Sequence, residues 1–90
     1  MTDEGAVPAF AVGVKFRFDT VRNQWVVLAP ERLFLPDEQA VAILQLVDGI
    51  RSLGGIVDTL AAQFNAPREV LAKDVGDMLR DLAAKGAVRL

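Results

Sequence analysis

A short apolar stretch bounded by two prolines, residues 30–36, most constrains how this chain can fold. Proline has no backbone N–H to donate to a sheet, so it occurs at strand ends, at sheet edges and in turns. A strand between Pro30 and Pro36 is therefore expected at a sheet edge. The outer backbone groups of an edge strand are unpaired. Such an edge is therefore covered by another segment, protected from pairing by charges or prolines, or paired with another chain. We expect this edge to bind a peptide as an additional strand.

Two further strands are predicted before this edge. Val14, Phe16 and Phe18 alternate with charged residues, which predicts a strand with one buried and one solvated face. Residues 24–29 are mostly apolar and predict a covered middle strand. Because the connections between these segments are short, we expect an antiparallel meander in which the strands follow chain order.

Three helices are predicted after the sheet, each with a recognisable start or stop. Asp37 and Ser52 are suitable N-caps, and Pro67 suits the start of the third helix. Gly54 and Gly55 weaken the first turn of the second helix, which predicts either a frayed turn or a close backbone approach. The predicted extents are residues 37–48, with Asp48-Gly49 as the stop, then residues 52–64 and 67–85, with Gly86 as the stop.

The predicted elements define an α+β domain of winged-helix type. Ninety residues make one domain, which we place at residues 14–90, and residues 1–13 have no periodicity and are expected to be a flexible leader. No stretch approaches the ~20 apolar residues that a membrane span needs, so we expect a cytoplasmic protein without membrane contact. We expect a monomer in dilute solution, with edge-to-edge dimers at high concentration.

The composition argues against catalysis. The chain has no cysteine and no histidine, so thiolate chemistry is excluded and the commonest general base and metal ligand are missing. There is also no glycine-rich phosphate loop. Asp74, Asp77 and Asp81 share one face of the third helix, but carboxylates without other ligands are typical of a solvated face. We therefore expect no enzyme activity, no cofactor and no metal.

The winged-helix arrangement leaves a DNA-binding regulator as the alternative function. A helix that enters a DNA groove normally has a basic excess, with Arg, Asn or Gln directed at base edges. The third helix has no Asn or Gln, and its basic residues are balanced by acidic ones. The net charge of the chain is −2. We therefore favour a peptide over a nucleic acid as the partner.

Side chains must supply most of the affinity for such a peptide. Four ladder hydrogen bonds at ~0.5–1.5 kcal/mol each roughly offset the ~1–2 kcal/mol per residue that ordering the peptide backbone costs. Leu33 and Leu35 share one face of the edge strand and Arg32 and Phe34 the other, and the sequence leaves open which pair packs inward. The alternative for Leu33, Leu35 and Met78 is a place in the core, and the alternative for Arg32 is a charge that prevents self-pairing of the edge. The candidate residues on the third helix are Lys73, Asp74, Asp77, Met78 and Asp81.

Several motifs spread over residues 14–88 resemble those of a known protein family. They are Val14-Lys15-Phe16-Arg17, Arg22, Trp25-Val26-Val27-Leu28-Ala29-Pro30-Glu31, Ile43-Leu44, Asp48-Gly49, Ala66-Pro67, Asp74-Val75 and Gly86. Together they resemble the PqqD family of pyrroloquinoline quinone (PQQ) biosynthesis. The Trp…Leu-Ala-Pro-Glu run followed by Asp-Gly is the most specific part. The chain departs from the family pattern at Phe64, where a tyrosine is expected, and at Gly54-Gly55.

The resemblance implies a peptide chaperone. The PqqD family binds the ribosomally made precursor peptide PqqA and presents it to PqqE, a radical S-adenosylmethionine enzyme that cross-links a glutamate to a tyrosine in that peptide. Related domains are called precursor-peptide recognition elements, and they hold a leader peptide as an added strand on the third strand, against the third helix. The resemblance therefore implies PqqA and PqqE as partners.

Overall fold

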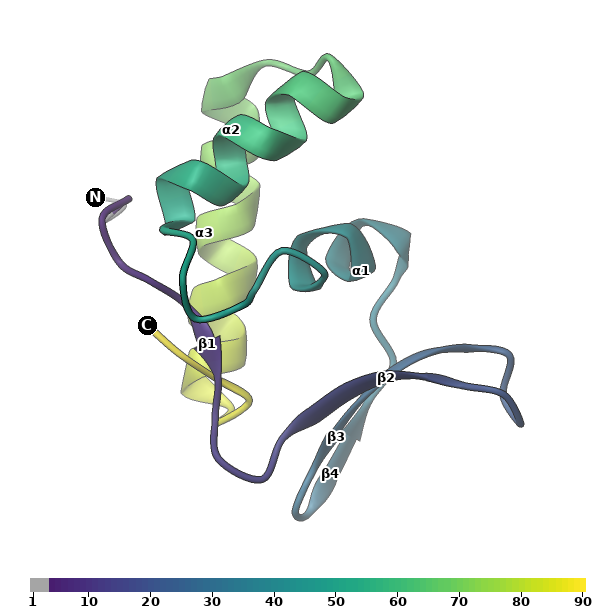
Figure 1. The fold of residues 1–90 in the computed structure, drawn as a ribbon. Coiled ribbons are helices and arrows are strands. Elements are labelled where there is room, and N and C mark those ends of the chain that lie inside the picture. Colours follow the sequence, from purple (N-terminus) through teal and green to yellow (C-terminus); the bar gives the residue numbers. More distant parts are fainter. Residues whose placement is uncertain (1–3) are drawn as a thin grey trace.

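A three-stranded antiparallel sheet stands beside three helices (Figure 1). The computed structural model describes residues 4–90. The α+β class, the meander and the three helices predicted from the sequence are confirmed. In chain order the elements are β1 (Ala9–Phe10), β2 (Lys15–Asp19), β3 (Gln24–Ala29), β4 (Arg32–Phe34), α1 (Glu38–Leu44), α2 (Leu53–Phe64), α3 (Arg68–Ala84) and β5 (Val88–Arg89).

Side-chain and glycine caps set the helix boundaries, largely as predicted. Asp37 Oδ1 accepts a hydrogen bond of 2.8 Å from the N–H of Ala40 at the start of α1. Ser52 Oγ accepts one of 3.1 Å from the N–H of Gly55 at the start of α2. Gly86, with φ +80°, follows α3 in the left-handed conformation that glycine adopts without strain.

The end of α1 differs from the prediction, because the helix stops at Leu44 and not at Gly49. Asp48 Oδ1 accepts hydrogen bonds from the N–H groups of Ile50 (2.9 Å) and Arg51 (2.8 Å). Such local bonds from an aspartate stabilise a turn in competition with a helix. Gly49 does adopt a positive φ of +75°, but it does so inside this turn.

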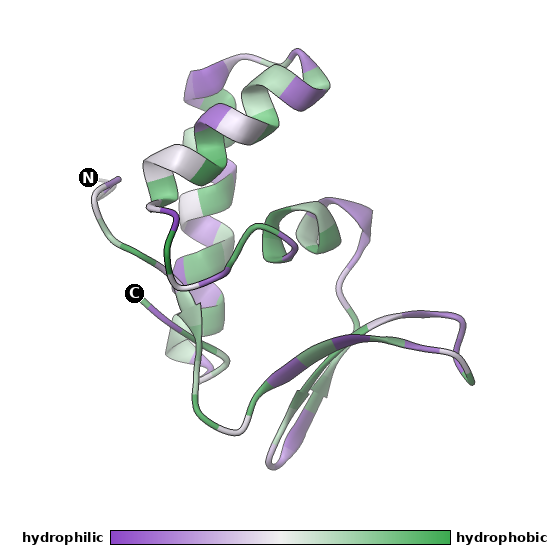
Figure 2. Cartoon of the chain, viewed as in Figure 1, coloured by the Kyte–Doolittle hydropathy of each residue, from purple (hydrophilic) through white to green (hydrophobic). Residues whose placement is uncertain are grey.

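The hydrophobic core lies where the three helices meet one face of the sheet and β5. Hydrophilic and hydrophobic residues alternate along β2 (Figure 2), as expected for a strand with one solvated face. None of the described helices combines the length and apolar character needed to cross a membrane. The core cluster consists of Val27, Ile43, Leu44, Val47, Leu53, Ile56, Val57, Leu60, Val75, Leu79, Ala87 and Val88.

The N-terminal segment is packed against the domain over its described part. β1 pairs with β5 in antiparallel fashion, and the chain before β1 runs along the start of α2 (Figure 1). The carbonyl oxygens of Glu4 and Ala6 accept hydrogen bonds from the N–H groups of Gly54 (2.9 Å) and Leu53 (2.7 Å). These donors belong to the first turn of α2, where no helical acceptor exists. This arrangement differs from the flexible leader predicted for residues 1–13, of which residues 1–3 lie outside the described part.

An ion-pair network ties the same segment to α2 and α3. The Arg68 guanidinium donates to the carboxylates of Glu4 (2.6 Å) and Asp58 (2.5 Å). The hydrogen bond from Arg68 holds the pKa of Glu4 below its usual value. Because all three groups are exposed, the pairs contribute little to stability. The backbone hydrogen bonds therefore do most to fix the segment.

Gly54 and Gly55 should respond differently to replacement by alanine, although they are neighbours in one helical turn. A Cβ at Gly54 would lie 2.9 Å from Glu4 Oε1 and 3.3 Å from its carbonyl oxygen, whereas one at Gly55 meets only Ser52 Oγ, at 3.4 Å. We expect Gly55→Ala to raise the free energy of unfolding by up to about 1 kcal/mol through helix propensity. Gly54→Ala should lose that gain because the Glu4 backbone must move. Urea unfolding of both variants checks this, and equal stability would contradict the close approach.

Candidate functional site

The outer edge of β4 is unpaired in the described part of the chain, because β4 pairs only with β3. Ala29 and Arg32 flank the two-residue turn and form the first pair of the ladder, followed by the pair Leu28 and Leu33. Hydrogen-bonded and non-hydrogen-bonded pairs alternate along an antiparallel ladder. The pair that closes such a turn is hydrogen-bonded, so the next one is not. The backbone N–H and C=O of Leu33 therefore point to the free edge.

The structure shows which face of β4 packs against the core and which face is exposed. Phe34 lies opposite the buried Val27 and packs against the core cluster. Leu33, on the other face, is 40% exposed, and Leu35, just after the strand, is 57% exposed. Arg32 is exposed as well. Of the four residues predicted on this strand, Phe34 thus supports the sheet from inside, and the other three are accessible.

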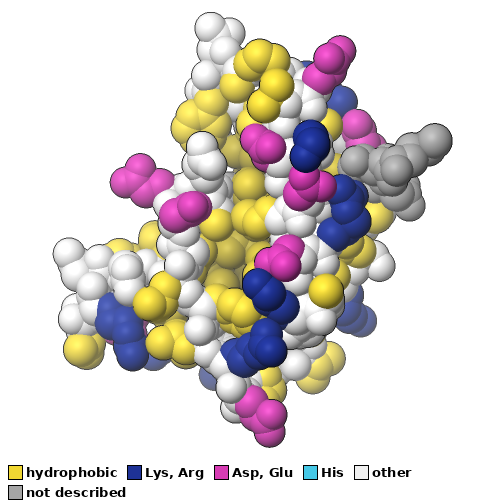
Figure 3. All heavy atoms as spheres, turned by 180° about the vertical axis from the view of Figure 1, so that it is seen from behind, with side chains coloured by type: hydrophobic (Ala, Val, Ile, Leu, Met, Phe, Trp, Pro, Cys, Tyr) yellow, Lys and Arg dark blue, Asp and Glu magenta, His cyan; other side chains and the backbone are white. Residues whose placement is uncertain are grey.

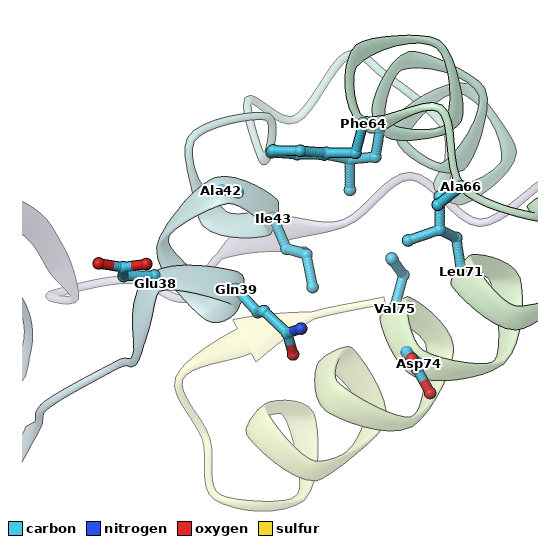
Figure 4. A pocket seen from close by; sticks show the side chains of 10 residues that line it. Glu38, Gln39, Ala42, Ile43, Phe64, Ala66, Leu71, Asp74 and Val75 are labelled. Carbon is cyan, nitrogen blue, oxygen red and sulfur yellow. The ribbon is translucent and has the colours of Figure 1, made fainter.

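A groove runs between α1 and α3 and consists of two adjoining hollows of about 360 and 210 Å³. Both hollows are lined by Gln39, Ile43 and Asp74. In Figure 4, Ile43 from α1 and Leu71 and Val75 from α3 project into the larger hollow. The other residues that line the groove are Glu38, Ala42, Leu60, Phe64 and Ala66 in the larger hollow, and Asp37, Ala40 and Met78 in the smaller one.

This α1–α3 groove has an apolar floor and a polar rim. Seen from behind, the molecule has a hydrophobic hollow at its centre, with charged side chains of both signs along the α3 side (Figure 3). Phe64, at the end of α2, lies across the larger hollow from Val75 and is 55% exposed (Figure 4). The smaller hollow includes Asp37, which is three residues beyond the end of β4. An extended chain on the β4 edge would therefore have this groove close by.

The five residues predicted on α3 fall into two groups. Asp74 and Met78 line the groove. The carboxylate of Asp77 lies 2.8 Å from Lys73 Nζ and 2.7 Å from an Arg80 nitrogen, and these hydrogen bonds hold the pKa of Asp77 below its usual value. The Asp81 carboxylate is likewise 2.8 Å from the ammonium of Lys85. Lys73, Asp77 and Asp81 thus form exposed ion pairs and do not line either hollow.

The sequence reasoning missed the contribution of α1 and α2 to the groove. Ile43 of α1 belongs to the core cluster and also lines the groove between α1 and α3. Phe64 of α2, which departs from the family pattern, also lines the groove and was not among the predicted site residues. An exposed phenylalanine at a helix end, beside polar residues, was the available signal for a binding surface. No group of three or more metal-ligating side chains occurs among the described residues.

The fold and the site define a small α+β domain whose open strand edge adjoins an apolar groove, a combination on which extended peptides can add as strands. A family model described as "Coenzyme PQQ synthesis protein D (PqqD)" matches residues 24–88. The chain belongs to the PqqD family. The resemblance seen in the sequence motifs is therefore confirmed.

Relatives with established names cover most of the chain. A protein of Rhodopseudomonas palustris named "PqqA binding protein" is 51% identical over 83 residues, which are 92% of this chain and 81% of the relative. A protein of Gluconobacter oxydans with the same name is 47% identical over 94% of this chain and 88% of its own length. The "Bifunctional coenzyme PQQ synthesis protein C/D" of Methylorubrum extorquens is 44% identical over 88% of this chain but only 21% of its own length.

Solved structures of relatives have the same fold. The solution structure of the PqqD part of Methylobacterium extorquens PqqCD matches with a TM-score of 0.83 and 39% identity, covering 100% of this chain and 96% of that one. That domain is described as a functional, stand-alone recognition element for ribosomally synthesised and post-translationally modified peptides (RiPPs). The crystal structure of PqqD from Xanthomonas campestris matches with a TM-score of 0.63 and 38% identity over the full length of both chains.

Proposed function

We propose that this chain binds the precursor peptide PqqA in PQQ biosynthesis, by adding the peptide as a strand to β4 beside α3. The unpaired outer edge of β4 is the observation that carries the proposal. A strand edge with free N–H and C=O groups is a template for an extended chain. The names of the relatives, "PqqA binding protein" and RiPP recognition element, support PqqA as the class of ligand.

The groove supplies the affinity that backbone pairing lacks. Ladder hydrogen bonds roughly balance the entropy lost by the peptide, so the surplus must come from buried side chains. Burying one Leu- or Phe-sized side chain contributes about 1.5–3 kcal/mol. Ile43, Leu71 and Val75 offer an apolar surface for such a side chain.

Each predicted site residue has a distinct role in this arrangement. Leu33 and Leu35 flank the added strand, while Phe34 holds β4 on the core. Asp74 and Met78 contact the segment of the peptide that enters the groove. The remaining members of the set, Arg32, Lys73, Asp77 and Asp81, lie outside both hollows and contribute charge near the bound peptide.

We also propose that the chain presents PqqA to PqqE in the cytoplasm and does no chemistry itself. A peptide held by one edge of β4 is covered on that side only, so its remaining length is free to enter an enzyme. The lack of histidine and cysteine leaves the chain without a thiol nucleophile and without an imidazole as general base. An activity assay of the chain with PqqA alone should therefore yield unmodified peptide.

Titration of isotope-labelled protein with synthetic PqqA tests the proposal. We expect amide shifts to be concentrated at residues 32–35, along α3 and around Ile43, because strand addition changes the hydrogen bonding of the edge directly. Duplex DNA serves as the second ligand, since a DNA-binding regulator is the alternative. Shifts on the solvent face of α3 with DNA, together with none with PqqA, would contradict peptide binding.

A further inference from the structure

The charged side chains that line the α1–α3 groove are all acidic. The lining includes Asp37, Glu38 and Asp74 and contains no Lys or Arg. Asp37 is engaged as the cap of α1 through its hydrogen bond from the N–H of Ala40. Glu38 and Asp74 form no ion pair with any residue in the described range 4–90. Two exposed carboxylates therefore stand unpaired at the rim of an apolar groove.

The basic residues of α3 are already engaged elsewhere. Lys73 precedes Asp74 in sequence, but its ammonium lies 2.8 Å from Asp77 Oδ2. Arg80 donates to the other oxygen of Asp77 at 2.7 Å. Lys85 is paired with Asp81 at 2.8 Å. Lys73, Arg80 and Lys85 thus form their ion pairs with other carboxylates, although the charge of the neighbouring Lys73 also acts on Asp74.

Glu38 and Asp74 both belong to the lining of the larger hollow, in which an apolar guest side chain would sit. Glu38 and Asp74 lie on opposite sides of the larger hollow, one on α1 and one on α3 (Figure 4). Ile43, Leu71 and Val75 project into the space between the helices (Figure 4). An acidic guest would bring like charges together here, whereas a cationic guest would gain from both carboxylates.

We propose that the peptide segment in this groove combines an apolar side chain with an adjacent Lys or Arg, whose cation is attracted by the negative charge of Glu38 and Asp74. This inference rests on the proposed function, because it specifies the part of PqqA that the groove selects. The apolar side chain occupies the floor, and the basic neighbour reaches the rim because successive side chains of an extended chain point to opposite sides. The groove thereby selects the register of the peptide as well as its composition.

Neutralising both rim carboxylates tests the inference. The double variant Glu38→Gln with Asp74→Asn should bind synthetic PqqA about fivefold more weakly than the wild type at about 20 mM salt. At about 500 mM salt the two proteins should bind nearly equally, because screening removes the attraction. The matched control is Asp58→Asn with Glu69→Gln, which removes the same charge outside the groove and should bind as the wild type does. Fluorescence anisotropy measures the affinity of the wild type, the double variant and the control for the peptide, and circular dichroism verifies that all three proteins are folded.

Replacing each Lys and Arg of the peptide by Gln completes the test as a double-mutant cycle. One such replacement should weaken binding to the wild type about fivefold and leave binding to the double variant unchanged. Equal binding of wild type and double variant at low salt would overturn this inference while leaving peptide binding intact. The same loss in the control variant would also overturn it. Failure of the wild type to bind PqqA at all would instead overturn the proposed function, and this inference with it.

Discussion

Replacing Leu33 with proline is expected to weaken PqqA binding by about 30-fold or more while the domain stays folded. The N–H of Leu33 belongs to a non-hydrogen-bonded pair and points to the free edge, so β3 loses no partner. A peptide on that edge loses a donor, and the proline ring obstructs its approach. Isothermal titration calorimetry with synthetic PqqA measures the change in affinity.

Leu33→Ala is the matched control for this variant. It removes the 40% exposed side chain but keeps the backbone donor, so it should bind PqqA much more tightly than the proline variant. An amide correlation spectrum must show that the pairing of β3 with β4 persists in Leu33→Pro. A folded proline variant with wild-type affinity would be incompatible with strand addition on β4.

Truncating Leu79 to alanine is expected to lower the free energy of unfolding by about 3 kcal/mol. Leu79 is fully buried on α3, in the core cluster between the helices, and its removal leaves a cavity that neighbours fill only partly. A domain of this size is stabilised by only about 5–15 kcal/mol in total. The midpoint of thermal unfolding should therefore fall by about 10 °C or more.

Val70→Ala, on the same helix, separates core packing from helix propensity. Val70 is 55% exposed, so truncation leaves no cavity, and alanine is the better helix former. Its free energy of unfolding should stay within about 0.5 kcal/mol of the wild type. A loss at Val70 comparable to that at Leu79 would mean that the solvent face of α3 is packed in solution.

The sheet and the helix starts could be predicted because their determinants are local. Two prolines delimit β4, alternation marks β2, and the side chain of Asp37 caps α1 within three residues of chain. The pairing of β1 with β5 could not be predicted in this way. β1 and β5 are only two residues long, so neither strand can show an alternating sequence pattern. Their pairing also joins Ala9 to Arg89, which are separated by nearly the whole chain.

The candidate site was predictable only on the elements that carry a sequence signal. The free edge of β4 followed from its prolines, and two of the residues predicted on α3, Asp74 and Met78, line the groove. The approach of α1 to α3, which brings Ile43 into the groove, depends on tertiary packing that the periodicity of a single helix does not specify. Which of these residues meet PqqA stays a prediction.

The pairing of β1 with β5 has a consequence for how the domain can be attached to other proteins. It brings segments near the two ends of the chain together beside α3, and from β1 and β5 the chain ends run away from the β2–β4 sheet (Figure 1). A fusion partner or an affinity tag at either terminus would thus emerge away from the outer edge of β4. The Methylorubrum extorquens relative, in which the matched region is 21% of a bifunctional protein, is compatible with such modular joining.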